Sequence, residues 1–239
     1  MGEVYKKTIG VTSKDCDMEN RMSASSMLKN NQQISINHCK DFDIEDDYYR
    51  KNGIAFLVAQ VSMEFHGSPK NDDVINVISE PFKPLRAIHY RYTEFFNANN
   101  NYCWASVDSR WILVDVKKKQ IIRNPPPELV FKNASESIKK HPHKLFRFSE
   151  VIFVGEETAT YSRCDLYHHL NNTEYANIIF DHLPIEILKR RFPSRVFISY
   201  RKEILLGKRF GIFMGNFENR YYILGSDEKE KYFEANVIF

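Results

Sequence analysis

Cysteine is scarce in this sequence and follows no metal or redox spacing. The chain of 239 residues contains four cysteines, and no two of them form a C-x-x-C pair or another spacing typical of a zinc site. Thiols stay reduced in the cytoplasm, whereas secreted chains usually pair their cysteines. We therefore expect free thiols, a cytoplasmic location, and neither a metal nor another cofactor.

The sequence also lacks an excess of one charge and a long apolar run. Lys and Arg number 34 against 31 Asp and Glu, which gives a formal net charge of +3 and argues against a nucleic-acid binder. No uninterrupted apolar stretch approaches the roughly 20 residues of a membrane-spanning helix. With 43% hydrophobic residues, the chain is expected to form one large or two smaller packed domains without a membrane span.

Two stretches of the sequence resemble copies of one unit. "SKDCDMENRMSASSML" aligns with "YSRCDLYHHLNNTEYA", which places Cys16 opposite Cys164 and Asp17 opposite Asp165. A helical pattern follows each stretch, and segments rich in β-branched and aromatic residues follow each helix. The chain is therefore expected to be a doubled unit.

The helical pattern is clearer in the second copy. Apolar residues recur at the spacing of one helix face at Tyr175, Ile178, Ile179 and Leu183. Asn171 with Glu174 three residues later has the form of a capping box, and Pro184 is expected to end the helix. In the first copy a helix is expected over residues 23–39, with a buried face marked by Met27, Ile34 and His38.

The remaining patterns indicate strands joined by short turns. The expected strands cover residues 53–66, 73–82, 87–97, 101–122, 195–206, 209–218, 219–226 and 231–239. Their connections are too short for crossover helices, so the sheets should be antiparallel. The sequence thus predicts an α+β fold of two units, each a long helix wrapped by a curved antiparallel β-sheet.

A proline-rich, polar segment separates the two units. "RNPPPELVFKNASESIKKHPHK" has three consecutive prolines and a mixture of Lys and His, which is typical of a linker. We therefore expect one domain at residues 1–125, a linker at 126–147, and a second domain at 148–239.

Several of these segments resemble one enzyme family. "SRCDLYHHLNNTEYANII" is similar to the motif D-x-N-x-H-x-N-N-x-x-Y of the acyl-[acyl carrier protein] thioesterases of plants and bacteria. "SRWILVD", "IIRNP" and "ISYRKEILLGKRF" also resemble parts of that family, in the same order. The resemblance implies two hotdog domains in tandem. It also implies hydrolysis of fatty acyl-[acyl carrier protein] thioesters, which releases free fatty acid and ends chain elongation.

The resemblance also assigns roles to individual positions. It implies a catalytic site at Asp165, His169 and Glu203, with the family's paired asparagines and tyrosine at Asn171, Asn172 and Tyr175. One position departs from the motif, because Tyr167 stands where the family has a catalytic asparagine. A phenol can donate and accept hydrogen bonds, but its oxygen lies farther from the backbone than a side-chain amide does.

The chemistry of thioester hydrolysis fits these residue types. The reaction needs an activated water and a group that stabilises negative charge on the carbonyl oxygen. We expect His169 and Glu203 to activate the water, Asp165 to hold the loop or the imidazole, and backbone amides at the helix start to stabilise the oxyanion. Judged without the family, the Asp and the two Asn residues fit helix capping better than catalysis. Arg21 stands opposite His169, so only the second unit should be catalytic.

Two further predictions concern the substrate. Met22 and Met27 of the first unit are expected to line an acyl-binding tunnel, or else to be ordinary core residues of a helix. Asn171 and Asn172 of the second unit are also expected to bind substrate. An acidic carrier protein would dock on a basic segment, unless these charges only solvate a helix end. The residues of this segment are Lys189, Arg190, Arg191 and Arg195.

Three functions remain open on sequence alone. The first is an acyl-[acyl carrier protein] hydrolase, and the second is a related hydrolase of coenzyme A thioesters. The third is an acyl-binding protein with weak or no catalysis, which the Tyr167 departure suggests. A tandem pair satisfies internally the interface that single hotdogs form by dimerising, yet exposed strand edges leave room for a homodimer.

Overall fold

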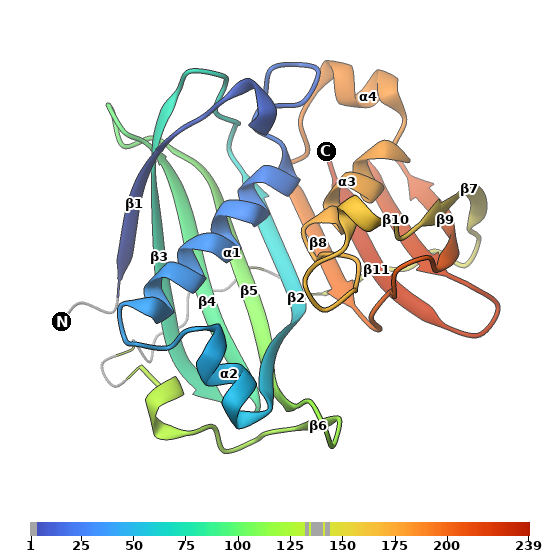
Figure 1. Ribbon diagram of the computed structural model, residues 1–239. Helices are drawn as coiled ribbons and strands as arrows, with labels where there is room; N and C mark the ends of the chain where they lie inside the picture. The colour runs from blue at the N-terminus through green and yellow to red at the C-terminus, as the bar shows by residue number, and fades with distance from the viewer. Residues whose placement is uncertain (1–3, 132–133, 135–140, 142–143) are drawn as a thin grey trace.

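The computed structural model describes residues 4–131, 134, 141 and 144–239. Eleven strands form one continuous antiparallel sheet with the order β1-β3-β4-β5-β2-β8-β11-β10-β9-β7, and β6 pairs with β5. Figure 1 shows the main helices lying against one face of this sheet. None of the helices in these residues has the length and apolarity that a membrane crossing requires.

Each half of the chain contributes one helix-bearing unit to this sheet. The first half holds the 3₁₀-helix η1 (Ser13–Asp15), the helices α1 (Ala24–Lys40) and α2 (Asp46–Asn52), and the strands β1 (Tyr5–Gly10), β2 (Ile54–Phe65), β3 (Val74–Leu85), β4 (Ile88–Asn97), β5 (Cys103–Asp115) and β6 (Gln120–Ile121). The second half holds η3 (Tyr161–Arg163), α3 (Glu174–Asp181), α4 (Ile185–Arg190), β7 (Ile152–Thr158), β8 (Arg195–Tyr200), β9 (Arg209–Phe217), β10 (Arg220–Ser226) and β11 (Lys231–Ile238). The predicted α+β class of antiparallel sheet is confirmed.

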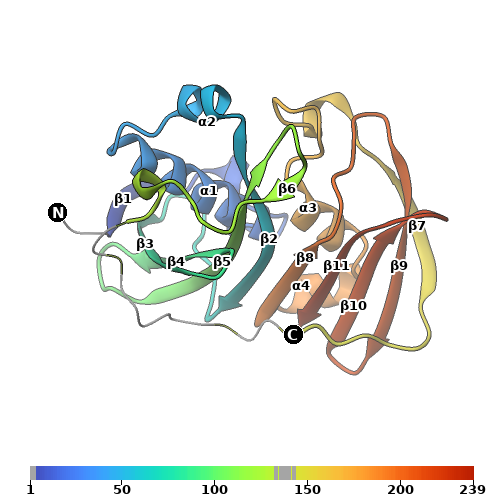
Figure 2. The same cartoon turned by 90° about the horizontal axis from the view of Figure 1, so that it is seen from below.

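The two halves join through backbone hydrogen bonds between β2 and β8. Five residue pairs, from Gln60 opposite Ser199 to Glu64 opposite Arg195, make this antiparallel ladder. The view from below in Figure 2 shows the sheet passing through the boundary without a break. The two predicted units therefore share one continuous sheet. The predicted domain limits, 1–125 and 148–239, stay a prediction.

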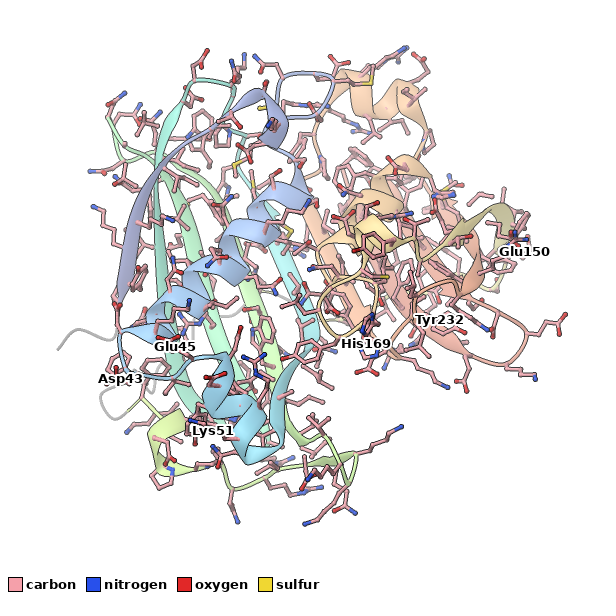
Figure 3. The ribbon with its side chains drawn as sticks, in the orientation of Figure 1. Asp43, Glu45, Lys51, Glu150, His169 and Tyr232 are labelled. Carbon is pink, nitrogen blue, oxygen red and sulfur yellow. The ribbon has the colours of Figure 1, made fainter. Side chains whose placement is uncertain are left out.

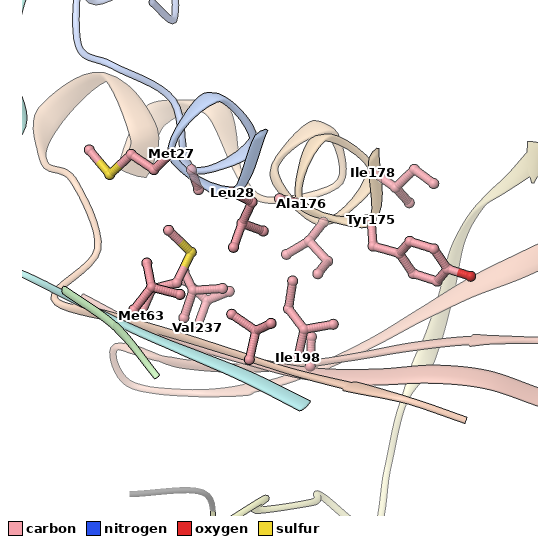
Figure 4. Close-up of a cluster of buried hydrophobic side chains, with 14 of the residues drawn as sticks. Met27, Leu28, Met63, Tyr175, Ala176, Ile178, Ile198 and Val237 are labelled. Carbon is pink, nitrogen blue, oxygen red and sulfur yellow. The ribbon is translucent and has the colours of Figure 1, made fainter. Parts of the chain in front are cut away.

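A single apolar core runs under α1 and α3. Met27 and Leu28 of α1 and Ile178 of α3 lie on the helix side of this core, and Met63 and Ile198 lie on the sheet side (Figure 4); all five are buried. Because side chains three and four residues apart share one helix face, the apolar spacing of both segments places them against the sheet. The predicted buried face of α1, with Met27, Ile34 and His38, is confirmed.

The second helical segment is shorter than the sequence predicted. The α3 helix ends at Asp181 with His182 as its cap, and Pro184 then starts the separate helix α4. Proline is well suited to a helix start because it has no backbone N–H to leave unsatisfied there.

Both edge strands lie outside the strands predicted from the sequence, and one predicted strand ends earlier in the structure. Strand β1 is mostly exposed, and strand β7 exposes Ile152 and Phe153, so neither shows a simple alternation of apolar and polar residues. Strand β8 ends at Tyr200, which leaves Glu203 on the following loop instead of on the predicted strand.

The linker packs on the molecule where the structure describes it. The short 3₁₀-helix η2 (Pro127–Leu129) places Leu129 in a small core with Ile44, Ile54 and Leu113 at the end of the first half. His141 is buried on the other face of the sheet, with Nδ1 2.9 Å from the carbonyl oxygen of Ser62. Residues 132–133, 135–140 and 142–143 of the predicted linker lie outside the described residues.

A buried carboxylate fastens the segment after the linker to the outer face of the sheet. Glu234 is 2% exposed and accepts hydrogen bonds from Arg147 (2.5 Å), Arg201 (3.0 Å) and the hydroxyl of Tyr222 (2.9 Å). Its neighbours Phe233 and Ala235 point into the core, so Glu234 points the opposite way. The hydrogen bonds from Arg147, assisted by those from Tyr222 and Arg201, lower the pKa of this carboxyl to about 2.

We predict that Glu234→Gln lowers the free energy of unfolding at neutral pH by on the order of 3 kcal/mol, because the arginines lose their charged partner. The folded-state pKa of Glu234 lies below its ordinary value of 4.5, so its contribution is present above about pH 4.5 and disappears as the pH falls toward about 2. Urea unfolding at about pH 7 and about pH 3 should therefore show a smaller pH dependence in the variant.

The control is Asp47→Asn, which removes an exposed ion pair with Arg50. This variant should leave the stability nearly unchanged, because an exposed ion pair is screened by solvent. Equal losses in the two variants would contradict the importance of the buried carboxylate.

Candidate active site

A tight turn built around Asp165 carries the predicted catalytic histidine. The Asp165 carboxylate accepts hydrogen bonds from the backbone N–H groups of Tyr167 (2.9 Å) and His169 (3.2 Å). The backbone N–H of Asp165 donates to the carbonyl oxygen of His169 at 2.8 Å, and His168 takes the left-handed conformation with φ of 62°. Asp165 therefore shapes the loop and makes no hydrogen bond to the imidazole.

The first half contains the same turn with a different side chain at its end. Asp17 accepts from the backbone N–H groups of Glu19 (2.9 Å) and Arg21 (3.0 Å), and Asn20 takes the left-handed conformation with φ of 57°. An isolated bridge between Cys16 and Met22 matches one between Cys164 and Leu170. The predicted repeat is thus present in the backbone itself.

The residue opposite His169 has a structural function. Arg21 donates to the Asp17 carboxylate at 3.0 Å and to the carbonyl oxygen of Leu188 at 2.7 Å, and its guanidinium lies 5.2 Å from the ring centre of Phe192. It therefore ties the first half to the segment that includes α4.

The structure brings His169 and Glu203 together, although 33 positions separate them in the printed sequence. The Nε2 atom of His169 lies 3.5 Å from Oε2 of Glu203, and Figure 3 shows His169 at the lower end of the second half. The side chain of His169 is 26% exposed and that of Glu203 52%, so water reaches both groups.

Paired backbones hold these two side chains at this distance. The N–H of Leu170 donates to the carbonyl oxygen of Ile204 at 2.8 Å, and the N–H of Leu206 donates to that of His168 at 2.9 Å. Ile204 is fully buried and anchors the loop, while Gly207 supplies a left-handed turn with φ of 81°. The position of Glu203 therefore does not depend on a regular strand.

Two tyrosines in contact with each other lie close to this site, Tyr175 buried and Tyr200 partly buried. The rings of Tyr175 and Tyr200 lie 5.0 Å apart, and the Tyr200 hydroxyl donates to the carbonyl oxygen of Asn172 at 2.9 Å. Burial raises the pKa of Tyr175, and the carboxylates of Glu203 and Asp165 raise it further, so this phenol stays neutral. Tyr200 was not predicted as a site residue. The only feature of the sequence that could have indicated it is its position shortly before Glu203.

The start of α3 differs from the predicted capping box. The side-chain oxygen of Asn171 accepts from the backbone N–H and hydroxyl of Thr173, at 3.0 and 2.9 Å. The Glu174 carboxylate instead binds Lys29 at 3.1 Å and Asn177 at 2.8 Å. Asn171 is therefore a helix-start residue, and Glu174 joins α3 to α1.

The predicted oxyanion donors are already engaged. Four backbone N–H groups around the start of α3 donate to oxygens of the chain itself, namely those of Leu170, Asn171, Thr173 and Glu174. The prediction that backbone amides at the helix start hold an oxyanion is wrong for these four groups. Asn172 makes no side-chain hydrogen bond among the described residues.

Cys164 is not suited to act as a nucleophile. Burial raises the pKa of its thiol, and the adjacent Asp165 carboxylate raises it further. The thiol therefore stays protonated at neutral pH, and only the thiolate is an effective nucleophile.

Two cavities border the loop that carries His169. An apolar cavity of about 240 Å³ lies among α1, α2 and the strands β2–β5, and Tyr167 reaches its edge. A polar cavity of about 380 Å³ lies between α1 and the start of α3 and is lined by Asn171. Gln32 and Ile36 line both cavities, so the two meet along α1. His169 and Glu203 line neither of them.

The two methionines predicted to bind substrate lie elsewhere. Met22 is 1% exposed and Met27 is fully buried, and both belong to the core between α1 and the sheet. The structure thus favours the alternative that they are core residues, because the described cavities have other linings.

The side chains of the predicted docking segment do not form one free basic surface. Arg195 donates to Glu64 within the sheet at 2.6 Å, and the guanidinium of Arg191 lies 5.3 Å from the ring centre of Phe239. This leaves Lys189 and Arg190 exposed on α4, with Lys189 3.4 Å from Glu186. In Figure 1, α4 lies at the top of the second half, at the end of α3 away from the His169 loop.

Comparisons with known proteins agree with this architecture. Residues 2–130 match the family model of the acyl-ACP thioesterase N-terminal domain, and residues 153–236 match that of the C-terminal domain. A chloroplastic acyl-[acyl-carrier-protein] hydrolase of Cuphea viscosissima is 20% identical over 221 residues, which cover 84% of this chain and 52% of that protein. The chain thus spans about half the length of the curated relatives it matches.

Solved structures show the same fold over the whole chain. The 12:0-ACP thioesterase from Umbellularia californica has a TM-score of 0.83 at 17% identity, covering 100% of this chain and 97% of that one. An acyl-ACP thioesterase from Bacteroides thetaiotaomicron has a TM-score of 0.82 at 16% identity, covering 99% and 98%. At this identity the structures support the tandem hotdog architecture and not a particular chemistry.

We predict that Asp165→Ala loosens the turn and lowers the free energy of unfolding by about 1–2 kcal/mol, because two backbone N–H groups lose their acceptor. Hydrogen exchange should become faster at the amides of Tyr167 and His169. Asp17→Ala is the matched control in the twin turn. It should cost at least as much stability, because it also removes the ion pair with Arg21, and it should speed exchange at Glu19 and Arg21 instead of at Tyr167 and His169. Unchanged exchange at His169 in Asp165→Ala would contradict this role.

Proposed function

Because the chain belongs to the acyl-ACP thioesterase family, we propose that it hydrolyses fatty acyl-[acyl carrier protein] thioesters, releasing free fatty acid and ending chain elongation. The observation that carries this proposal is the approach of His169 to Glu203, at 3.5 Å, on two loops that are paired through their backbones. An imidazole and a carboxylate in reach of solvent are the groups that general-base activation of water requires.

In the proposed mechanism, a water molecule near His169 and Glu203 attacks the thioester carbon. The imidazole takes a proton from the water, and the Glu203 carboxylate orients the ring and stabilises the imidazolium. A new C–O bond forms, and the carbonyl oxygen carries the negative charge of the tetrahedral intermediate. The C–S bond then breaks, and the imidazolium returns the proton to the leaving thiolate.

Asp165 acts in this mechanism as a positioning residue, since its contacts fix the backbone of the loop and do not touch the imidazole. We assign stabilisation of the oxyanion to the side-chain amide of Asn172, which follows His169 by three positions and has no hydrogen-bond partner among the described residues. One well-placed donor of this kind contributes on the order of 10²-fold to 10³-fold in rate.

The proposed partner is an acidic acyl carrier protein. Lys189, Arg190 and Arg191 are exposed, but Lys189 lies near Glu186, Arg191 stacks on Phe239 and Arg195 pairs with Glu64, so the support from this segment is weaker than the sequence suggested. We also propose a cytoplasmic location, which is supported by four cysteines that form no disulfide among the described residues. We further propose that a homodimer could form through one of the edge strands, β1 or β7. In the described sheet each of these strands has a neighbouring strand on one side only, which leaves the other edge open.

A second candidate function is acyl binding with little turnover. Tyr167 is 60% exposed and extends to the apolar cavity, so it does not take the place of a short amide beside His169. Hydrolysis of coenzyme A thioesters is a further alternative. Rates measured on matched acyl-carrier and acyl-coenzyme A substrates distinguish the two hydrolase activities, and binding without hydrolysis of either supports the acyl-binding function.

We predict that His169→Ala and Glu203→Gln each lower kcat on an acyl-carrier thioester by on the order of 10³-fold with little change in KM, because both groups act on the water and not on the acyl chain. His168→Asn is the matched control. It alters the neighbouring imidazole, and asparagine tolerates the left-handed backbone at this position. Near-native turnover in both site variants would falsify the assignment.

We predict that Tyr167→Asn raises kcat by about tenfold, since one hydrogen bond from a short amide to the site is worth about that factor. Tyr161→Asn, at an 88% exposed position of the same loop, should leave the rate unchanged. Steady-state kinetics on one acyl-carrier thioester gives both values. An inactive wild type with an active variant would support the acyl-binding alternative, and equal rates would show that the departure has no cost.

A further inference from the structure

The apolar cavity contains a buried positive charge at its inner wall. Arg91, on β4, is 7% exposed and lines the cavity together with aromatic residues such as Phe56, Trp111 and Phe131. Its guanidinium carbon lies 5.7 Å from the ring centre of Phe131. A cavity for a plain hydrocarbon chain needs no charged group, so this arginine requires an explanation.

The described residues do not neutralise this charge. One guanidinium nitrogen of Arg91, Nη1, donates to the hydroxyl of Ser79 at 3.1 Å and lies 3.2 Å from Nδ1 of His38. Among residues 4–131, 134, 141 and 144–239, no carboxylate forms an ion pair with Arg91. Glu45 and Asp46 line the outer part of the cavity but are exposed. A guanidinium has five N–H donors, so donors remain for a ligand.

The charge state of the group follows from its surroundings. Burial lowers the pKa of Arg91 to about 10, which leaves it positively charged at neutral pH. Burial and the charge of Arg91 lower the pKa of His38 to about 4, so that imidazole is neutral and accepts the hydrogen bond. An unpaired buried charge is destabilising, and an anionic ligand would offset this cost.

A second polar group lines the same cavity without a partner. His89 precedes Arg91 by two positions on β4, so both side chains lie on one face of the strand. Its Nε2 atom is buried and makes no hydrogen bond among the described residues. Burial lowers the pKa of His89 to about 4, so it is neutral and offers one hydrogen-bonding nitrogen on each side of the ring.

These two groups lie far from the proposed point of hydrolysis. Across the sheet, Arg91 on β4 lies opposite Ser109 on β5, and Ser109 lies opposite Val61 on β2. Val61 in turn lies opposite Ile198 on β8, the strand that precedes Glu203. Three spacings between neighbouring strands amount to about 14 Å. Tyr167 at the cavity edge links this space to the His169 loop. An acyl chain that enters from His169 would thus bring its far end toward Arg91.

We propose that the cavity binds an acyl chain whose far end carries a carboxylate, with Arg91 as the cation that recognises it and His89 as a hydrogen-bonding neighbour. This inference rests on the proposed thioesterase function and specifies its substrate class. A guanidinium binds a carboxylate through two parallel N–H···O bonds, which fixes the position of the chain end. A methyl-ended chain would leave Arg91 without a counterion.

The test compares two acyl-carrier thioesters of equal chain length, one methyl-ended and one carboxylate-ended. Wild-type protein should prefer the carboxylate-ended substrate in kcat/KM, and Arg91→Leu should lower that preference by on the order of 100-fold. Arg91→Lys keeps the charge without the two-pronged geometry and should give an intermediate value. Arg50→Leu, near the cavity on α2 but outside its lining, is the control for general loss of charge.

Each outcome decides the proposal. A wild-type preference for the methyl-ended substrate that Arg91→Leu does not alter would overturn it. If neither thioester is hydrolysed, the thioesterase function fails, and binding of the same two thioesters is measured by calorimetry. Tighter binding of the carboxylate-ended thioester to wild type than to Arg91→Leu then supports the cavity assignment, and equal binding overturns it.

A third measurement distinguishes a carboxylate at the far end of a bound acyl chain from the carboxylate of a free fatty acid. Thermal unfolding is followed with dodecanoate and with dodecanol. If dodecanoate stabilises wild type but not the Arg91 variants, and turnover shows no preference between chain ends, Arg91 recognises a free fatty acid and the substrate proposal is wrong. If one variant fails to fold, the other is used in all three measurements.

Discussion

The site depends on one pair of backbone contacts, which joins the loop around His169 to the loop around Glu203. Leu170 donates to Ile204 and Leu206 donates to His168, so the two side chains meet because their main chains are paired. Main-chain pairing is insensitive to the identity of neighbouring side chains. Residues such as Tyr167 can therefore differ from the family motif without moving the imidazole away from the carboxylate.

The twin turns show how a repeated backbone acquires two functions. Asp17 and Asp165 accept the same two backbone hydrogen bonds, but the side chain at the end of the turn differs. Arg21 reaches across to the other half, whereas His169 faces Glu203 and solvent. The same backbone frame therefore carries a structural side chain in the first half and the candidate catalytic imidazole in the second.

The sequence allowed prediction of elements whose residues repeat with a strong period, and of residues inside a short motif. The apolar face of α1 and most central strands have such periods, and His169 lies in a dense polar motif. The strands β1 and β7 lie at the sheet edges, where one side of each strand meets solvent and no strict alternation is needed. The roles of Arg195 and Met27 depend on neighbours far away in the sequence. The cavity around Arg91 depends on how α2 closes over the sheet, which no local pattern reveals.

The ladder between β2 and β8 has a mechanical consequence. Hinge motion between two domains requires a boundary that few hydrogen bonds cross, yet here a five-pair ladder crosses it. The two halves therefore behave as one rigid frame, and the spacing between the hydrolytic loop and the inner wall of the apolar cavity is fixed. A frame of this kind holds the two ends of a bound chain at a constant separation.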